Sequence, residues 1–149
     1  MSRIPAERMR RSSYPYVSPV IARYADVDAF LHINNVAMAQ YFEDARISLL
    51  RTLLEMQQMH MGDGRVLLAR QSIDYLREGR YPGSLEVGVA ITAVGRTSVT
   101  VGMGLFQDDV CIATSDAVLV RLDDKGPREW SSDERTVLSD PVWHPQASD

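Results

Sequence analysis

The sequence contains a single cysteine, Cys111, in 149 residues, and it has no hydrophobic run long enough to span a membrane. A single cysteine excludes a disulfide within the chain, and it is typical of proteins from a reducing compartment. The first residues also lack the apolar segment of a secretory signal peptide. We therefore expect a soluble, cytoplasmic protein without a membrane partner.

Basic residues are not in excess, because 16 Lys and Arg stand against 20 Asp and Glu, for a net charge of −4. General nucleic-acid-binding domains usually show a strong basic excess, so nucleic acid is not an expected partner. The histidines His32, His60 and His144, with the one cysteine, do not have the spacing of a metal site. There is no glycine-rich phosphate loop, G-x-S-x-G elbow or H-E-x-x-H motif. We expect no metal and no cofactor.

The length and the hydrophobic content of 45% are sufficient for one domain with its own core. Residues 1–16 carry four arginines and two prolines without clear periodicity, which predicts a frayed, flexible arm. A basic N-terminus can also indicate a transit peptide, but this stretch contains Glu7 and no amphipathic run. Residues 17–140 are predicted to form the domain, and residues 141–149 an unstructured tail.

A long helix is predicted from Val36 to about Met59, because apolar residues recur there at intervals of three and four. The apolar stripe consists of Met38, Phe42, Ala45, Leu49, Leu53 and Met56. Gly62-Asp63-Gly64 has the composition of a turn and should end the helix. A helix with one broad apolar stripe must bury it, and a sheet can cover it.

Alternating apolar residues predict strands on both sides of this helix. The predicted strands cover residues 17–25, 66–75, 85–91, 99–105 and 110–122. Short turns at Gly95-Arg96 and Asp108-Asp109 join the last three strands into an antiparallel meander. A short helix is predicted for residues 131–138, with Ser131 or Ser132 as its N-cap. One long helix and a meander together predict an α+β fold.

Polar side chains are densest between Arg23 and Asn35, directly before the long helix. Two carboxylates, an imidazole and two amides fall within ten residues there. Asparagine is a favoured N-cap, so part of this pattern is typical of any helix start. A helix N-terminus also presents free N–H groups and a partial positive charge, which can stabilise an anion. A carboxylate beside such an end makes a usable active site.

This segment resembles the signature R-x-x-D-x-D-x-x-x-H-x-N-N of hotdog-fold acyl-CoA thioesterases of the 4-hydroxybenzoyl-CoA thioesterase type. Further similarity lies in Tyr41-Phe42-Glu43-Asp44-Ala45-Arg46, in residues 71–77 and in residues 95–99, so that residues 18–138 are covered. The first motif is fairly specific, and the others belong to the framework. The resemblance implies a hotdog fold, which is an antiparallel sheet curled round a central helix. It also implies a homodimer or homotetramer with active sites at the seam between subunits.

The resemblance implies roles for individual residues. Asp28 matches the acid that acts as nucleophile or general base, whereas Asp26 matches an acid with a structural role in the turn. Asn35 lies where the backbone N–H polarises the thioester carbonyl. His32 matches a histidine that many relatives lack, so a polar contact near the substrate is as good an interpretation as catalysis. Glu43 is the reserve carboxylate, although a solvated or interface acid paired with Arg46 is the better interpretation.

Two residues depart from the family pattern. Leu31 stands where relatives usually have glycine, and Met38 stands where an aromatic residue is common. A leucine in that loop can narrow it, which leaves the size of the substrate open. Neither change removes the carboxylate or the helix end.

The substrate implied by the resemblance is an acyl-CoA, whose phosphates need cations on a chain that is acidic overall. Arg77, Arg80 and Arg96, all in turns, are the candidate cluster for these phosphates, although each alone is typical of a solvated turn. Two other functions stay open. One is a non-catalytic hotdog module that binds an acyl thioester, and the other is a dehydratase or isomerase of the same fold.

Overall fold

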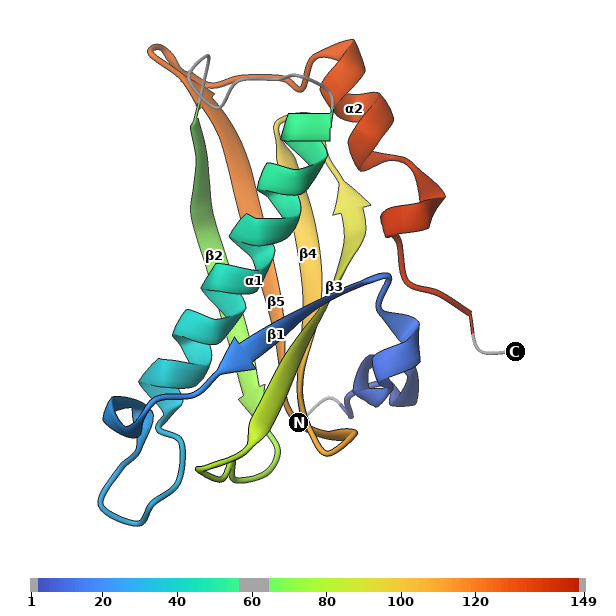
Figure 1. Cartoon of the computed structure of the whole chain (residues 1–149). Coiled ribbons are helices and arrows are strands. Elements are labelled where there is room, and N and C mark those ends of the chain that lie inside the picture. Colours follow the sequence, from blue (N-terminus) through green and yellow to red (C-terminus); the bar gives the residue numbers. More distant parts are fainter. Residues whose placement is uncertain (1–2, 57–64, 148–149) are drawn as a thin grey trace.

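The computed structural model describes residues 3–56 and 65–147. An antiparallel sheet of six strands curls along the long helix α1 (Asn35–Met56), as Figure 1 shows. The strands are β1 (Tyr16–Ile21), β2 (Arg65–Tyr75), β3 (Ser84–Val94), β4 (Ser98–Gln107), β5 (Val110–Asp123) and β6 (Gly126–Pro127). Their order in the sheet is β1-β3-β4-β5-β2, and β6 extends the sheet locally by pairing with the end of β5. The predicted α+β hotdog fold is confirmed.

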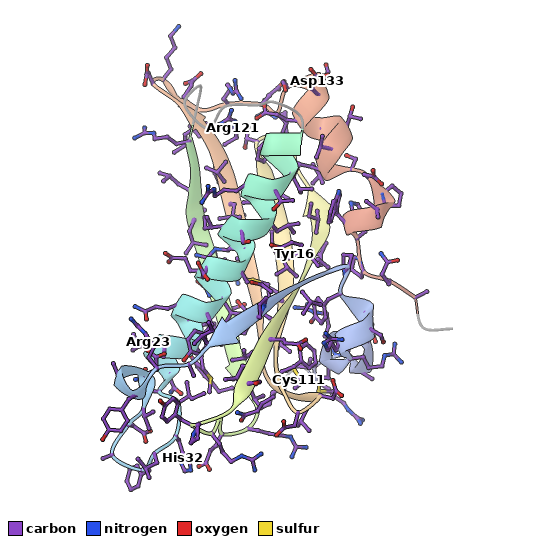
Figure 2. All side chains as sticks on the ribbon, viewed as in Figure 1. Tyr16, Arg23, His32, Cys111, Arg121 and Asp133 are labelled. Atoms are coloured by element: carbon purple, nitrogen blue, oxygen red, sulfur yellow. The ribbon has the colours of Figure 1, made fainter. Side chains whose placement is uncertain are left out.

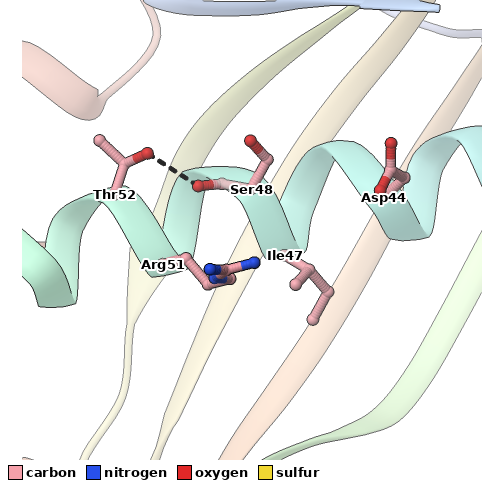
Figure 3. Close-up of a pocket in the computed structure, with 5 residues that line it drawn as sticks. All are labelled: Asp44, Ile47, Ser48, Arg51 and Thr52. Carbon is pink, nitrogen blue, oxygen red and sulfur yellow. Dashed lines mark hydrogen bonds between the residues drawn. The ribbon is translucent and has the colours of Figure 1, made fainter. Parts of the chain in front are cut away.

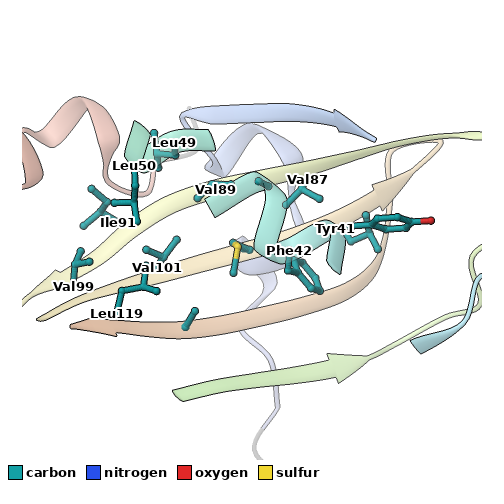
Figure 4. Close-up of a cluster of buried hydrophobic side chains, with 14 of the residues drawn as sticks. Tyr41, Phe42, Leu49, Leu50, Val87, Val89, Ile91, Val99, Val101 and Leu119 are labelled. Carbon is teal, nitrogen blue, oxygen red and sulfur yellow. The ribbon is translucent and has the colours of Figure 1, made fainter. Parts of the chain in front are cut away.

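Helix α1 packs through the apolar stripe that its sequence predicts. Met38, Phe42, Ala45, Leu49 and Leu53 are all buried, and they form one cluster with the inward residues of the sheet (Figure 4). The helix begins at Asn35, one residue before the predicted start. Residues 57–59 of the predicted helix, and the turn at Gly62-Asp63-Gly64, lie outside the described residues.

Strands β3, β4 and β5 form the predicted meander and supply the floor of the core. Leu85, Val87, Val89 and Ile91 of β3 are buried, as the alternation predicts, and the alternating residues 99–105 of β4 are buried as well. The β4–β5 hairpin turns at Asp108 and Asp109, whose φ angles of 51° and 62° are left-handed. Aspartate tolerates this region better than most residues because its short polar side chain can bond locally.

The first strand is shorter than predicted, because β1 ends at Ile21 and residues 24–26 form a 3-10 turn. The reason is local. The Asp26 carboxylate accepts a hydrogen bond from the Arg23 N–H at 2.9 Å, and such side-chain bonds compete with a strand ladder.

The N-terminal segment is not the free arm that we expected. Residues 6–9 and 11–13 form short 3-10 helices, and the first of them contacts β4 and β5. Arg8 pairs with Asp116 at 2.9 Å and donates to the Ser115 carbonyl at 3.0 Å. Tyr14 is buried against Phe106, with ring centroids 5.9 Å apart. The space for its ring exists because Gly88 has no side chain, since a Cβ there would lie 2.6 Å from the ring.

The C-terminal part also differs from the prediction at its end. Helix α2 (Ser132–Leu138) has Ser131, one of the two predicted candidates, as its N-cap, and Glu134 completes a capping box. Residues 141–143, expected to be unstructured, form a 3-10 turn. The Gln146 N–H donates to the Ser13 carbonyl at 2.8 Å, so this tail lies against the N-terminal segment.

The charged residues at the α2 end of the sheet form a buried cluster. The Glu134 carboxylate, which is buried, forms an ion pair with the Arg121 guanidinium at 2.9 Å and accepts a hydrogen bond from Arg128 at 2.8 Å. Figure 2 places Arg121 at the end of the sheet opposite to His32. None of the helices in the described part of the chain is both long and apolar enough to cross a membrane.

Strand β2 is an edge strand, and its apolar residues are poorly covered. Among the strands in the described part of the chain, β5 is its single partner. Leu67 and Leu68 are both exposed, although the sequence of this strand is rich in apolar residues. Exposed apolar side chains along an open edge are typical of a surface that pairs with another chain.

Candidate active site

The loop before α1 is held in place by Asp26. Its buried carboxylate accepts hydrogen bonds from the Arg23 N–H at 2.9 Å and from the Tyr41 hydroxyl at 2.7 Å. Burial alone would raise the pKa of Asp26, but these hydrogen bonds and the Arg23 charge outweigh it and lower the pKa. Burial, and then the bond to Asp26, raises the pKa of Tyr41. Asp26 therefore has the structural role that the sequence predicts.

Asp28 closes a tight turn over residues 28–32. Its Oδ1 atom accepts from the Phe30 N–H at 2.9 Å and from the His32 N–H at 3.1 Å. The backbone repeats the closure, since the Asp28 N–H donates to the His32 carbonyl at 2.9 Å. No hydrogen bond joins Oδ2 to any residue in the described part of the chain. The carboxylate is thus oriented by one oxygen and exposed, with the other oxygen available.

Leu31 occupies the left-handed region in this turn, with a φ of 62°. Leucine is strained there by about 1–2 kcal/mol, because its Cβ approaches the following carbonyl. A glycine at this point would avoid the strain. The departure from the family pattern at Leu31 therefore has a structural consequence, which is a strained backbone in this turn.

The N-terminus of α1 is capped beside Asp28's turn, and no described residue accepts a hydrogen bond from the Asn35 N–H. The Asn34 side chain accepts from the Ala37 N–H at 2.7 Å, so Asn34 is the N-cap. Asn35 is the first residue of the helix, where the N–H has no partner within the helix. The Tyr75 hydroxyl donates to the Asn35 carbonyl at 3.2 Å, and this bond joins the helix start to the end of β2.

These elements surround a hollow of about 410 Å³ at the N-terminal end of α1. It brings together Asp28, His32 and Asn35, as the sequence predicts, and adds Arg77. The remaining lining residues are Phe30, Ile33, Met38, Tyr75, Leu76 and Glu78. The side chain of His32 lies in the loop below the helix start (Figure 2). One carboxylate and a free helix-terminal N–H in one hollow are the minimum that an acyl transfer requires.

His32 pairs with a residue that the sequence analysis did not single out. Its Nε2 atom lies 3.2 Å from a carboxylate oxygen of Glu78, which is itself exposed. The two loops also bond through their backbones, because the Ile33 N–H donates to the Gly79 carbonyl at 2.9 Å. Glu78 and Tyr75 both lie in or next to residues 71–77, whose similarity to the family was assigned to the framework. That similarity was the signal that could have identified them.

Glu43 lies outside this hollow. Its carboxylate is 67% exposed and stands 3.7 Å from the Arg46 guanidinium, which is the pairing expected from the sequence. Arg46 is buried and also reaches Gln71 of β2 at 3.4 Å. Burial lowers the pKa of Arg46. Glu43 therefore belongs to a polar link between α1 and β2 and does not face the Asp28 site.

A model of the thioesterase superfamily matches residues 30–112, which is more than half of the chain. The chain belongs to this superfamily. The matched region includes His32, Asn35 and Glu43, and it begins two residues after Asp28.

Individual relatives agree with this membership. The uncharacterized protein YsmA of Bacillus subtilis is 29% identical over 133 residues, which are 86% of this chain and 88% of YsmA. A Thermus thermophilus thioesterase, solved with coenzyme A and zinc, is 27% identical with a TM-score of 0.74, covering 85% of this chain and 92% of that one. A predicted thioesterase from Bacillus stearothermophilus is 25% identical with a TM-score of 0.78, over 88% and 98% of the two chains.

The three arginines expected to bind phosphates do not form one cluster in this superfamily member. Arg96 lies at the α2 end of the sheet, where its carbonyl accepts from the Trp130 N–H and its guanidinium pairs with Glu129 at 2.9 Å. Arg80 lies at the other end of β4 and pairs with Asp108 at 3.3 Å. The ten residues of β4 separate these two ends, which is roughly 30 Å in a strand. Of the three, only Arg77 lines the hollow.

Cys111 is a core residue. It is buried with Tyr14, Ala90 and Phe106 on the outer face of the sheet. Burial raises the pKa of its thiol to about 11. A thiol with so high a pKa is a poor nucleophile at neutral pH. In the described residues, no three His, Cys, Asp or Glu side chains are close enough together to hold a metal ion.

A second hollow, of about 240 Å³, lies along the outer side of α1 (Figure 3). Its lining residues, Asp44, Ile47, Ser48, Arg51 and Thr52, all come from the helix. The Thr52 hydroxyl donates to the Ser48 carbonyl at 2.9 Å, which satisfies that side chain within the helix. A hollow built by one helix face lacks the converging groups of the Asp28 site.

Proposed function

We propose that this chain hydrolyses an acyl-CoA thioester to the free acid and CoA. Asp28 acts as nucleophile or general base, and the Asn35 backbone N–H donates to the developing oxyanion. The single observation that carries the proposal is that Asp28 and the N-terminal end of α1 line the same hollow. Membership of the thioesterase superfamily supports thioester hydrolysis as the reaction class.

The chemistry asks little of the protein because thiols have pKa values near 8.5, so a thiolate leaves without strong acid assistance. The remaining needs are an attack on the carbonyl carbon and stabilisation of the oxygen that becomes negative. As a nucleophile, the Asp28 carboxylate attacks the carbonyl and releases the CoA thiolate, and water then hydrolyses the mixed anhydride. As a general base, it takes a proton from the water that attacks. In both routes the helix N-terminus favours the negative oxygen.

CoA is proposed as the thiol because the Thermus thermophilus thioesterase was solved with coenzyme A, and its chain is 27% identical to this one. The hollow in this chain offers Arg77, which makes no ion pair with any other described residue, as a cation beside the thioester. His32 and its partner Glu78 contribute polar contacts at the rim.

The alternative is a hotdog module that binds an acyl thioester without hydrolysing it. A pure binder has no need of an exposed carboxylate beside the carbonyl site, so Asp28 favours the enzyme. A thiol-release assay over acyl-CoAs of varied length and aromaticity separates the two functions. We expect turnover of at least one substrate. Binding of acyl-CoAs without release of any thiol would support the module and contradict the enzyme.

A further inference from the structure

Beside the candidate active site lies another hollow, of about 420 Å³. Leu76 and Arg77 line both hollows, so these two residues form the wall between them. The other lining residues are Met9, Asp109, Val110 and Cys111. Met9 comes from the N-terminal segment, and residues 109–111 come from the β4–β5 hairpin and the start of β5.

We propose that this hollow receives the distal part of the substrate's acyl chain, which crosses Leu76 from the Asp28 site. The inference rests on the proposed function for the identity of the ligand. It assigns a specificity role to Met9 and Val110, which lie far apart in the sequence and contact no catalytic group.

The lining fits an uncharged, apolar chain. Met9, Leu76 and Val110 are each partly exposed, between 37% and 44%, so a ligand would cover apolar surface that is now in water. Cys111 stays a neutral thiol at neutral pH, because burial raises its pKa to about 11, and it behaves as a small apolar group. Covering such surface is favourable in proportion to its area.

The charges at this hollow do not favour the other end of the substrate. The nucleotide of CoA carries several negative charges on its phosphates, and Asp109 stands in the lining. Arg77 is the one cation in the lining, and Asp109 carries the opposite single charge without forming an ion pair with it. The neighbouring Asp108 adds a further negative charge, which is matched by its partner Arg80 at 3.3 Å. The local net charge is therefore close to zero, which suits an acyl chain better than phosphates.

The N-terminal segment gives this hollow a fixed wall. Arg8, next to Met9, is anchored to the sheet by its pair with Asp116 at 2.9 Å and its bond to the Ser115 carbonyl. Met9 is therefore held over the β5 start. A methionine adapts its shape easily, which suits a wall that accepts chains of different length.

The test measures binding, so it does not depend on turnover. In an Asp28→Asn background, the affinities for decanoyl-CoA and for free CoA are measured by titration calorimetry, with and without Val110→Trp. The indole should fill the hollow. We expect Val110→Trp to raise the Kd for decanoyl-CoA at least about tenfold and the Kd for free CoA less than about twofold. Burial of two methylene groups already accounts for a tenfold change in Kd.

Met9→Trp, from another segment, should reproduce this result, which guards against a folding defect particular to the hairpin. Val142→Trp is the matched control, since Val142 is exposed on the 3-10 turn at 141–143 and lines neither hollow. Equal weakening of decanoyl-CoA and CoA would place the CoA part in the hollow and overturn the inference. No change in either would overturn it too. If only the binding of decanoyl-CoA is weakened and the wild-type protein releases no thiol, the proposed hydrolysis is wrong and the acyl-chain site is supported.

Discussion

Three side chains fix the loop that precedes α1, and each binds a different set of backbone groups. Asp26 holds the start of the loop through the Arg23 N–H, Asp28 closes the turn through the N–H groups of residues 30 and 32, and Asn34 caps the helix. Asp26 and Asn34 are also joined by a backbone bond of 2.9 Å. Of these three, only Asp28 leaves an oxygen available beside the hollow, so one acid of the pair is structural and the other is the one that we propose as catalytic.

Asp26→Asn should destabilise the protein by about 1.5–3 kcal/mol at neutral pH, as expected for lost hydrogen bonds to a charged group. Because the folded-state pKa of Asp26 is lowered, its contribution is present above the unfolded pKa of about 3.9 and is lost as the pH falls through the folded pKa. Urea unfolding of both proteins between pH 3 and pH 7 measures this. The difference in unfolding free energy should shrink below about pH 4, and a constant difference would contradict the role of the charge.

The start of α1 is the element on which the site depends. Its cap, Asn34, and its first residue, Asn35, hold the helix end against the turn and against Tyr75 of β2. The same helix carries the largest part of the core, so the position of the N–H groups is fixed by buried residues such as Met38 and Phe42. A rigid helix end is a preorganised donor, which is what oxyanion stabilisation requires.

Asn34→Ala removes the cap and should cost about 1 kcal/mol of stability, the usual value for a lost N-cap. Because the N–H groups at the helix end then fray, kcat should also fall, with little change in KM. Asn34→Ser restores a capping oxygen and should recover both quantities. Thermal unfolding and steady-state kinetics of the two variants give the comparison. Loss of stability without any loss of kcat would show that the helix end has no part in the reaction.

Periodicity in the sequence is sufficient to predict α1 and the three meander strands. Each of these elements buries one face, so its apolar residues recur at the period of a helix or of a strand. It does not predict where the N-terminal segment lies, because that depends on contacts with distant strands. The Tyr14 ring packs against a glycine of the sheet, and the Arg8 guanidinium donates to a backbone carbonyl. For the site, Asp28, His32 and Asn35 are close in sequence and are found together in the hollow. Arg96 does not belong to one phosphate-binding cluster with Arg80, because the two arginines lie in turns at opposite ends of the sheet. The sequence alone does not show at which end each turn lies.

Taken as a whole, the molecule presents uncovered apolar side chains beside the site and along the edge strand β2. Phe30 and Val36 are 79% and 70% exposed, and Leu67, Leu68 and Tyr75 of β2 are exposed as well. Strand β2 forms one edge of the sheet and lies beside α1 in Figure 1. A second copy that pairs along this edge would cover the surface and would extend the hollow into the seam between subunits.

We therefore expect a homodimer, or a homotetramer built from such dimers. Light scattering at micromolar concentration should give at least twice the chain mass of 16.7 kDa. The double variant Leu67→Lys, Leu68→Lys should dissociate the dimer, because charged residues on an edge strand oppose pairing. Val142→Lys, on an exposed residue away from β2, should not. A monomeric wild-type protein would contradict the proposed seam.

The most direct test of the reaction is the turnover number of Asp28→Asn. The amide oxygen of asparagine can accept the same bonds from the Phe30 and His32 N–H groups, so the turn should persist while the carboxylate is lost. We predict that kcat falls at least about a hundredfold, the usual effect of removing a catalytic group, with an unchanged unfolding transition. Glu43→Gln, which changes the acid outside the hollow, should keep kcat within about threefold of the wild type. Near wild-type turnover by Asp28→Asn, with a large loss in Glu43→Gln, would contradict the account and assign the chemistry to Glu43.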